Sequence, residues 1–139
     1  MSLESVQHYV TYNVQHKVLI CKEHQYGITD VVRHFRGEDH SKMSTKTRLK
    51  IRAATQHLEL ANPNDMQIPS AYCPPIDGIE LFDEGAQCKK CGYLAGASGS
   101  IEEHCRKQHD WKAKDEPIWM NQAVQTFYQG IIHSIYALI

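Results

Sequence analysis

The stretch CKKCGYLAGASGSIEEHCRKQH, residues 88–109, decides how this sequence is interpreted. Cys88 and Cys91 are separated by two residues, and His104 and His109 close the stretch. Two thiolates on a tight turn and two imidazoles on a helix make a tetrahedral donor set for zinc. The spacing C-x2-C-x12-H-x4-H therefore predicts a zinc site. Because the two histidines lie five positions apart, we expect the helix to loosen near His109.

A similar cluster lies upstream, between residues 21 and 40. Its candidate ligands follow the spacing C-x2-H-x9-H-x5-H and are Cys21, His24, His34 and His40. The segment CKEHQY at 21–26 aligns with CKKCGY at 88–93, which indicates an internal repeat. A histidine stands where the downstream cluster has its second cysteine. The repeat favours a second zinc site, and surface histidines are the alternative interpretation.

The two predicted sites differ in charge. Two thiolates neutralise a zinc ion, whereas the single thiolate of the first cluster leaves a net positive site. Three imidazoles also compete with protons near pH 6. We therefore expect the first site to release its metal earlier than the second when the pH falls.

Composition limits the class of protein. The 139 residues carry 15 basic and 16 acidic side chains, and this balance does not favour a nucleic-acid partner. The N-terminus has no pattern of a signal peptide, and no run of about 18 apolar residues predicts a membrane span. Five cysteines spaced with histidines indicate metal ligands rather than disulfides, so we expect a nuclear or cytoplasmic location and no membrane partner.

The remaining segments predict an α+β fold. A strand is expected at 14–20, a helix at 44–60 with Ser44 as its N-cap, and an extended Pro-rich loop at 62–78. Leu49, Ala53, Leu58 and Leu60 mark the expected apolar stripe of that helix. Two β-rich runs around Gln129 and Gly130 favour a C-terminal hairpin, and a helix over 120–137 is the competing prediction.

These segments combine into one predicted architecture, a small zinc-stabilised domain with two ββα-type zinc-finger units, a linking helix and a C-terminal β-hairpin. Neither finger has the usual aromatic core, since Leu19, Ile28, Ala86 and Ala95 stand at those positions. Each finger should therefore pack against other segments of the chain within a single composite domain, residues 1–139. Its expected parts are 14–40 for the first finger, 41–87 for helix and linker, 88–110 for the second finger and 117–139 for the hairpin or helix.

Base reading by the finger helices is not expected. Of the residues at helix positions −1, 3 and 6, only Arg33 is a good partner for guanine, and the segment 41–87 separates the two fingers. A basic run without acidic residues remains as a contact surface for phosphates or for an acidic partner. Its members are Lys42, Lys46, Arg48, Lys50 and Arg52.

Several motifs resemble a fungal double zinc-finger family named after protein D of the orsellinic acid biosynthesis cluster. They are KVLIC before the first site, HFRGEDH at its close, PPIDGIELFDEGAQCKKCGY before the second, EEHCRKQH at its close, and VQTFYQG near the end. The resemblance implies zinc binding at the eight positions named above and a nuclear or regulatory role in fungi. It implies no reaction.

The sequence thus predicts a non-enzymatic module with two structural zinc ions that contacts a protein partner and has no small-molecule substrate. A DNA- or RNA-binding module that uses the basic 42–52 helix is the alternative. A metal-dependent hydrolase built on the His-rich first cluster is a third class, and it needs an open coordination position that four protein ligands do not leave.

Overall fold

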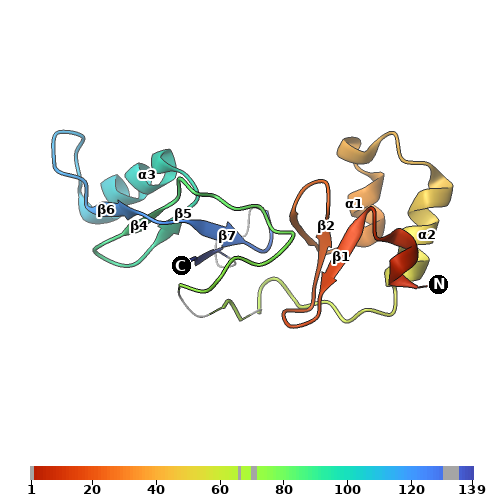
Figure 1. The fold of residues 1–139 in the computed structure, drawn as a ribbon. Helices are drawn as coiled ribbons and strands as arrows, with labels where there is room; N and C mark the ends of the chain where they lie inside the picture. The colour runs from red at the N-terminus through yellow and green to blue at the C-terminus, as the bar shows by residue number, and fades with distance from the viewer. Residues whose placement is uncertain (1, 66, 70–71, 130–134) are drawn as a thin grey trace. The chain divides into compact units, whose positions relative to one another are not determined.

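The computed structural model describes residues 2–65, 67–69, 72–129 and 135–139, without the side chain of Ser98. It divides into two compact units (Figure 1). The first comprises Met1–Gln67 and Phe127–Gly130, and the second comprises Ile68–Thr126 and Ile131–Ile139. No helix among the described residues has the length and apolar character that crossing a membrane requires. The expected single composite domain stays a prediction.

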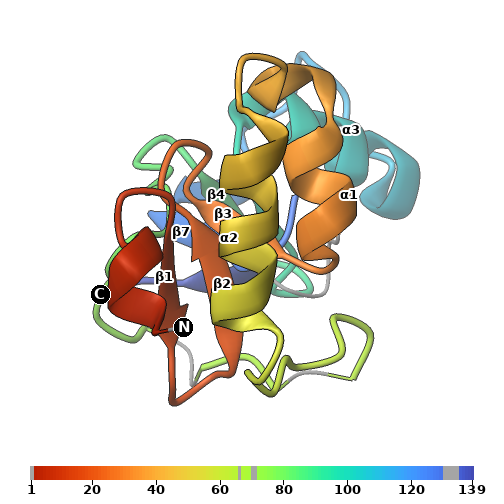
Figure 2. The ribbon, with the colours of Figure 1, turned by 90° about the vertical axis from the view of Figure 1, so that its right-hand side faces the viewer.

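The first unit is built on a three-stranded antiparallel sheet. The strands β1 (Val10–Asn13), β2 (Val18–Cys21) and β3 (Tyr26–Ile28) lie in the order β1-β2-β3. Two short 3-10 helices, η1 (Leu3–Val6) and η2 (Glu38–His40), and two α-helices, α1 (Val31–Arg36) and α2 (Thr45–Thr55), complete the unit. Both α-helices lie on the same side of the sheet (Figures 1 and 2).

The central strand β2 explains the core of this unit. All four of its residues, VLIC, are buried, and Leu19 and Cys21 belong to the core of this unit. The strand predicted at 14–20 begins only at Val18, because the preceding residues form a turn. In that turn His16 donates its backbone N–H to Asn13 Oδ1 at 2.8 Å, and Lys17 has a φ of 56°.

Helix α2 begins as predicted but ends earlier. Ser44 is its N-cap and accepts a hydrogen bond from the Thr47 N–H at 3.1 Å. The helix ends at Thr55 instead of residue 60. The chain after the helix is bound to the β1–β2 turn, because Ala61 N donates to Lys17 O. The predicted apolar stripe is wrong in its first half. Leu49 is 57% exposed, and the buried face consists of Ile51, Ala54 and Thr55.

The described residues of the second unit form two antiparallel sheets and one long helix. The strands β4 (Ala86–Cys88), β5 (Leu94–Ala95) and β6 (Trp119–Asn121) form a sheet in the order β5-β4-β6. Helix α3 (Ser98–His109) packs on β4 and β5. The core between them contains Ala86, Cys88, Ala95, Ile101, Cys105 and Trp111.

The C-terminal segment forms strands. β7 (Val124–Thr126) pairs antiparallel with β8 (Ile135–Ala137), so the competing helix over 120–137 is wrong. Gly130 of the turn predicted at Gln129–Gly130 lies outside the described residues. Trp119–Asn121 joins the sheet of β4 instead, a pairing that the sequence analysis did not predict.

A buried glutamine ties the Pro-rich loop to this sheet. Gln125 is 1% exposed. Its amide nitrogen donates to the carbonyls of Ile76 and Ile79 at 3.1 and 3.0 Å. Its amide oxygen accepts from Ile76 N at 2.8 Å and from the Tyr136 hydroxyl at 2.9 Å. A buried amide whose donors and acceptor are all used fixes the loop on its sheet.

The helices and antiparallel sheets of the two units confirm the predicted α+β class.

Candidate metal centres

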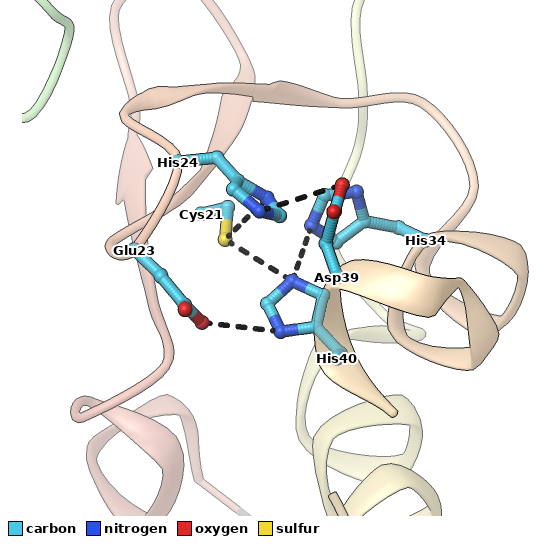
Figure 3. Close-up of polar contacts among 6 residues, drawn as sticks. All are labelled: Cys21, Glu23, His24, His34, Asp39 and His40. Carbon is cyan, nitrogen blue, oxygen red and sulfur yellow. Dashed lines mark hydrogen bonds and ion pairs between the residues drawn. The ribbon is translucent and has the colours of Figure 1, made fainter. Parts of the chain in front are cut away.

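The four predicted ligands of the first cluster come from three elements of the first unit and from the turn between β2 and β3 (Figure 3). Cys21 ends β2, His24 lies in the turn before β3, His34 lies on α1 and His40 ends η2. Asp30 caps α1 by accepting from Arg33 N, and α1 ends after Arg36. His40 lies six positions after His34, a spacing that would turn the two side chains away from each other on one straight helix. The break at Gly37 and the following 3-10 turn bring His40 back to the cluster.

The distances between these four side chains fit a metal site. One ligand atom of each residue lies within 4.8 Å of every other. Cys21 Sγ lies 3.6 Å from His24 Nδ1 and 3.7 Å from His40 Nε2, and the Nε2 atoms of His34 and His40 are 3.1 Å apart. A tetrahedral zinc ion would separate nitrogen from sulfur by roughly 3.6 Å and two nitrogens by roughly 3.3 Å. The cluster therefore has nearly the dimensions of a zinc coordination shell.

Two carboxylates contact the outer nitrogens of these imidazoles. Glu23 Oε2 lies 3.3 Å from His40 Nδ1, and Asp39 Oδ2 lies 3.8 Å from His24 Nε2 (Figure 3). Each carboxylate lies beside the ring nitrogen that points away from the cluster. Such contacts select the tautomer whose free nitrogen faces a metal.

Burial sets the protonation of the first cluster. Burial, followed by the nearby His40 and His24 imidazoles, lowers the pKa of His34 to about 4. Burial also lowers the pKa of His40 and raises that of the Cys21 thiol. The lowered pKa values of His34 and His40 favour the neutral imidazole that binds metals, whereas the thiolate form of Cys21 becomes more costly.

The second cluster lies in the second unit and joins Cys88, Cys91, His104 and His109. Their ligand atoms also lie within 4.8 Å of one another, and Cys91 Sγ is 3.2 Å from His104 Nε2. The Nε2 atom of His109 is buried and has no hydrogen-bond partner among the described residues. A bound metal would satisfy this nitrogen. Contrary to the expected loosening, α3 stays α-helical through His109.

The thiols around this cluster differ in acidity. Burial opposes ionisation of Cys88, but hydrogen bonds, led by those from the backbone of Cys91 and Lys90, bring its pKa below the ordinary value. Burial and the neighbouring Cys88 raise the pKa of Cys105 to about 11. Cys105 therefore remains a neutral thiol that packs within the core.

Each cluster contains a backbone turn of the same kind between its first two ligands. Gln25 N donates to Cys21 O at 2.7 Å, and Gly92 N donates to Cys88 O at 2.8 Å. Both donors have positive φ, 62° and 81°. The following strands repeat as well, because Leu19 pairs with Ile28 as Ala86 pairs with Ala95. The internal repeat of the sequence is therefore also a repeat of structure.

Sequence reasoning missed several residues around the clusters. Tyr93 stacks on His104 with ring centroids 4.0 Å apart, and Tyr26 stacks on His24 at 5.3 Å. Both tyrosines stand two positions after the second ligand, so the repeat itself could have identified them. Glu23 and Asp39 each precede a ligand histidine directly, and this adjacency was the available signal.

The predicted contact residues are dispersed around α1 and α2. Lys42, Lys46, Lys50, Arg52 and Arg33 are exposed. Arg48 is half-buried, and its guanidinium donates to Met43 O and Thr45 Oγ1, both at 2.9 Å. Arg48 therefore supports the start of α2. A contact of the other five with a partner stays a prediction.

The fold and its two clusters define a small α+β chain with two candidate Cys/His metal centres. The chain belongs to the family described as Orsellinic acid/F9775 biosynthesis cluster protein D, whose model matches residues 8–110. This confirms the resemblance seen in the sequence. A relative of that name from Emericella nidulans is 28% identical over 127 residues, 86% of this chain. The chain spans only 23% of that relative's length. No solved structure matches the chain.

Proposed function

We propose that this chain is a zinc-binding interaction module in which each cluster holds one structural zinc ion. One observation carries the proposal, namely that four cysteine and histidine ligand atoms converge within 4.8 Å in each unit. Mixed sulfur and imidazole donors in fours suit zinc better than magnesium or calcium, which prefer oxygen. In each unit a hairpin carrying the first ligands is followed by a helix, so we assign both to the ββα type of zinc finger.

The role of the zinc ions would be to stabilise the fold. In the first unit, the metal would tie β2 to α1 and η2 through Cys21, His34 and His40. In the second, it would tie the β4–β5 turn to α3 through Cys91 and His104. The energy of metal binding then becomes folding energy for units with small cores.

We propose no catalytic activity. Catalytic zinc has three protein ligands and an open position for water, whereas each cluster here offers four ligands. Absorption of the cobalt-substituted protein tests this assignment. Closed four-coordinate sites are expected, and an open or five-coordinate spectrum at the first site would instead support the hydrolase interpretation.

A metal count tests the central proposal. Zinc measured per chain should equal two, and Cys21→Ser and Cys88→Ser should each reduce it to one. Cys73→Ser is the matched control, because Cys73 is a half-buried thiol outside both clusters, and it should retain two. A value of one in the native chain, unaffected by Cys21→Ser, would reduce the first cluster to surface histidines.

The proposed partner is a protein, contacted in the nucleus or cytoplasm, where reducing conditions keep the ligand thiols free. The exposed Leu49 between Lys46 and Lys50 supports this proposal, because an apolar centre within a charged rim is typical of protein interfaces.

DNA or RNA binding through the basic residues of α2 is the second candidate, supported by the exposed Lys46, Lys50 and Arg52. A gel-shift assay at two salt concentrations separates the two. Binding at low salt that weakens steeply at high salt would favour nucleic acid, and no shift at low salt would remove that candidate.

A further inference from the structure

The internal repeat shows that the two clusters differ at more than their ligands. Where the second cluster has Cys91, the first has His24, which removes one negative charge from the metal shell. The residue directly before this ligand is Lys90 in the second cluster but Glu23 in the first. The residue before the last histidine is Gln108 in the second and Asp39 in the first. The cluster that lacks a thiolate thus has two additional carboxylates.

These carboxylates lie where their charge acts on the ligands. Glu23 is 3.3 Å from the outer nitrogen of His40, a side chain that is only 4% exposed. Asp39 is 3.8 Å from the outer nitrogen of His24, and Figure 3 shows the two carboxylates on different imidazoles. Both carboxylates are exposed, so they avoid the large desolvation cost of a buried charge.

We propose that Glu23 and Asp39 are positioning residues of the first metal site and supply the negative charge that a second thiolate supplies in the other site. Each lies beside the outer nitrogen of a ligand imidazole, favours the tautomer that carries its proton there and makes the inner nitrogen a better donor. With one thiolate and these two carboxylates, the surroundings of a divalent ion are no longer positive. This inference rests on the proposed zinc binding at the first cluster.

Partners of this kind change metal affinity about 10–100-fold when they are removed. Glu23 should have the larger effect, because its contact is shorter and its imidazole is more deeply buried. Asp39 is 77% exposed, and its effect should be near tenfold or below, since water screens the contact.

The test uses the full chain and zinc affinity measured by competition with a chelator. Glu23→Gln together with Asp39→Asn should weaken zinc binding at the first site at least about tenfold and leave the second site unchanged. Glu38→Gln is the matched control, since it removes an exposed carboxylate from the same 3-10 turn, and it should change affinity less than about twofold. Unchanged affinity in the double variant would overturn the inference.

A second background separates charge supply from a general role in folding. In His24→Cys the missing thiolate is restored and Asp39 loses its imidazole partner. The same two substitutions should then weaken binding less than about threefold, a loss smaller than in the native chain. An equal loss in both backgrounds would overturn the inference.

Cobalt spectra and far-UV circular dichroism of the loaded protein complete the test and need no His24 variant. A weakened cobalt thiolate band at the first site with unchanged circular dichroism supports the proposal, whereas parallel loss of both signals means that the carboxylates only stabilise the fold. If the native chain binds one zinc ion and Cys21→Ser does not change the count, the proposed function fails at this site and the inference fails with it. Two bound zinc ions with no effect of the double variant overturn the inference alone.

Discussion

Gly85, directly before β4, allows a close approach of backbone segments near the second metal centre. A Cβ atom at this position would lie 2.5 Å from Gln122 O, 2.9 Å from Ala95 O and 3.0 Å from Val124 Cγ2. Two of these atoms are backbone oxygens, and Gly85 O already accepts from Gln122 N at 2.8 Å. Gly85→Ala must therefore move strands, not a flexible side chain. We expect it to lower the free energy of unfolding by about 1–3 kcal/mol, the usual effect of overpacking.

The same substitution at Gly99 should have the opposite sign. Gly99 lies in α3, and a Cβ atom there would meet no atom within 4 Å. Gly99→Ala should raise the free energy of unfolding by roughly 0.5–1 kcal/mol, because alanine loses less backbone entropy in a helix. Urea unfolding of the zinc-loaded protein, followed by tryptophan fluorescence, measures both variants. If Gly85→Ala is as stable as Gly99→Ala, the reasoning from the close approach is refuted.

The remaining predictions concern the turns and the metals. Gln25→Gly should stabilise the first unit by up to about 1 kcal/mol in urea unfolding. Gln25 and Gly92 have positive φ at equivalent positions of the two turns that carry the ligands, and Gln25 is the one that is not glycine. A loss of stability would contradict this prediction. Zinc release followed against pH should begin at the first site, because burial raises the pKa of Cys21 whereas hydrogen bonds lower that of Cys88, whose thiolate therefore persists to lower pH. The low pKa of His34, about 4, keeps this ligand neutral in mild acid and so reduces the difference in release pH between the two sites. Release of zinc from the second site first would refute the prediction. Both tryptophans lie in the second unit, so their fluorescence should follow zinc loss there and remain constant during loss from the first site.

Ligand spacing was the most reliable guide to this protein. Local signals also placed Ser44 at the start of α2 and indicated strands near the C-terminus. The end of α2 depends on a bond between Ala61 and Lys17, which are distant in sequence, and no local pattern reports it. The pairing of β6 with β4 is non-local in the same way.

The error in the face of α2 has a simple geometric cause. Leu49 and Ile51 are two positions apart, so they lie on nearly opposite sides of a helix. An apolar stripe can be drawn through either residue, and the choice depends on what the helix packs against. Ile51 with Ala54 follows the i, i+3 spacing and contacts the core of the first unit, whereas Leu49 faces solvent.

The two centres have the same kind of turn between their first two ligands, but they pack on different cores. The pair Leu19 and Ile28 fills the first unit beside Phe35 and Ile51, so a separate helix, α2, supplies part of that core. The equivalent pair in the second unit, Ala86 and Ala95, leaves room for Ile101 and Trp111.

In neither unit do the hairpin and its following helix bury these positions alone. The first unit needs α2, and the second needs Trp111 and the strand β6 that pairs with β4. Zinc would fix the ligand turn relative to the helix, but the apolar surface beneath it is covered by elements outside the ligand spacing. A fragment limited to residues 88–109 should therefore bind metal without reproducing the packed unit, since Trp111 and β6 would be absent.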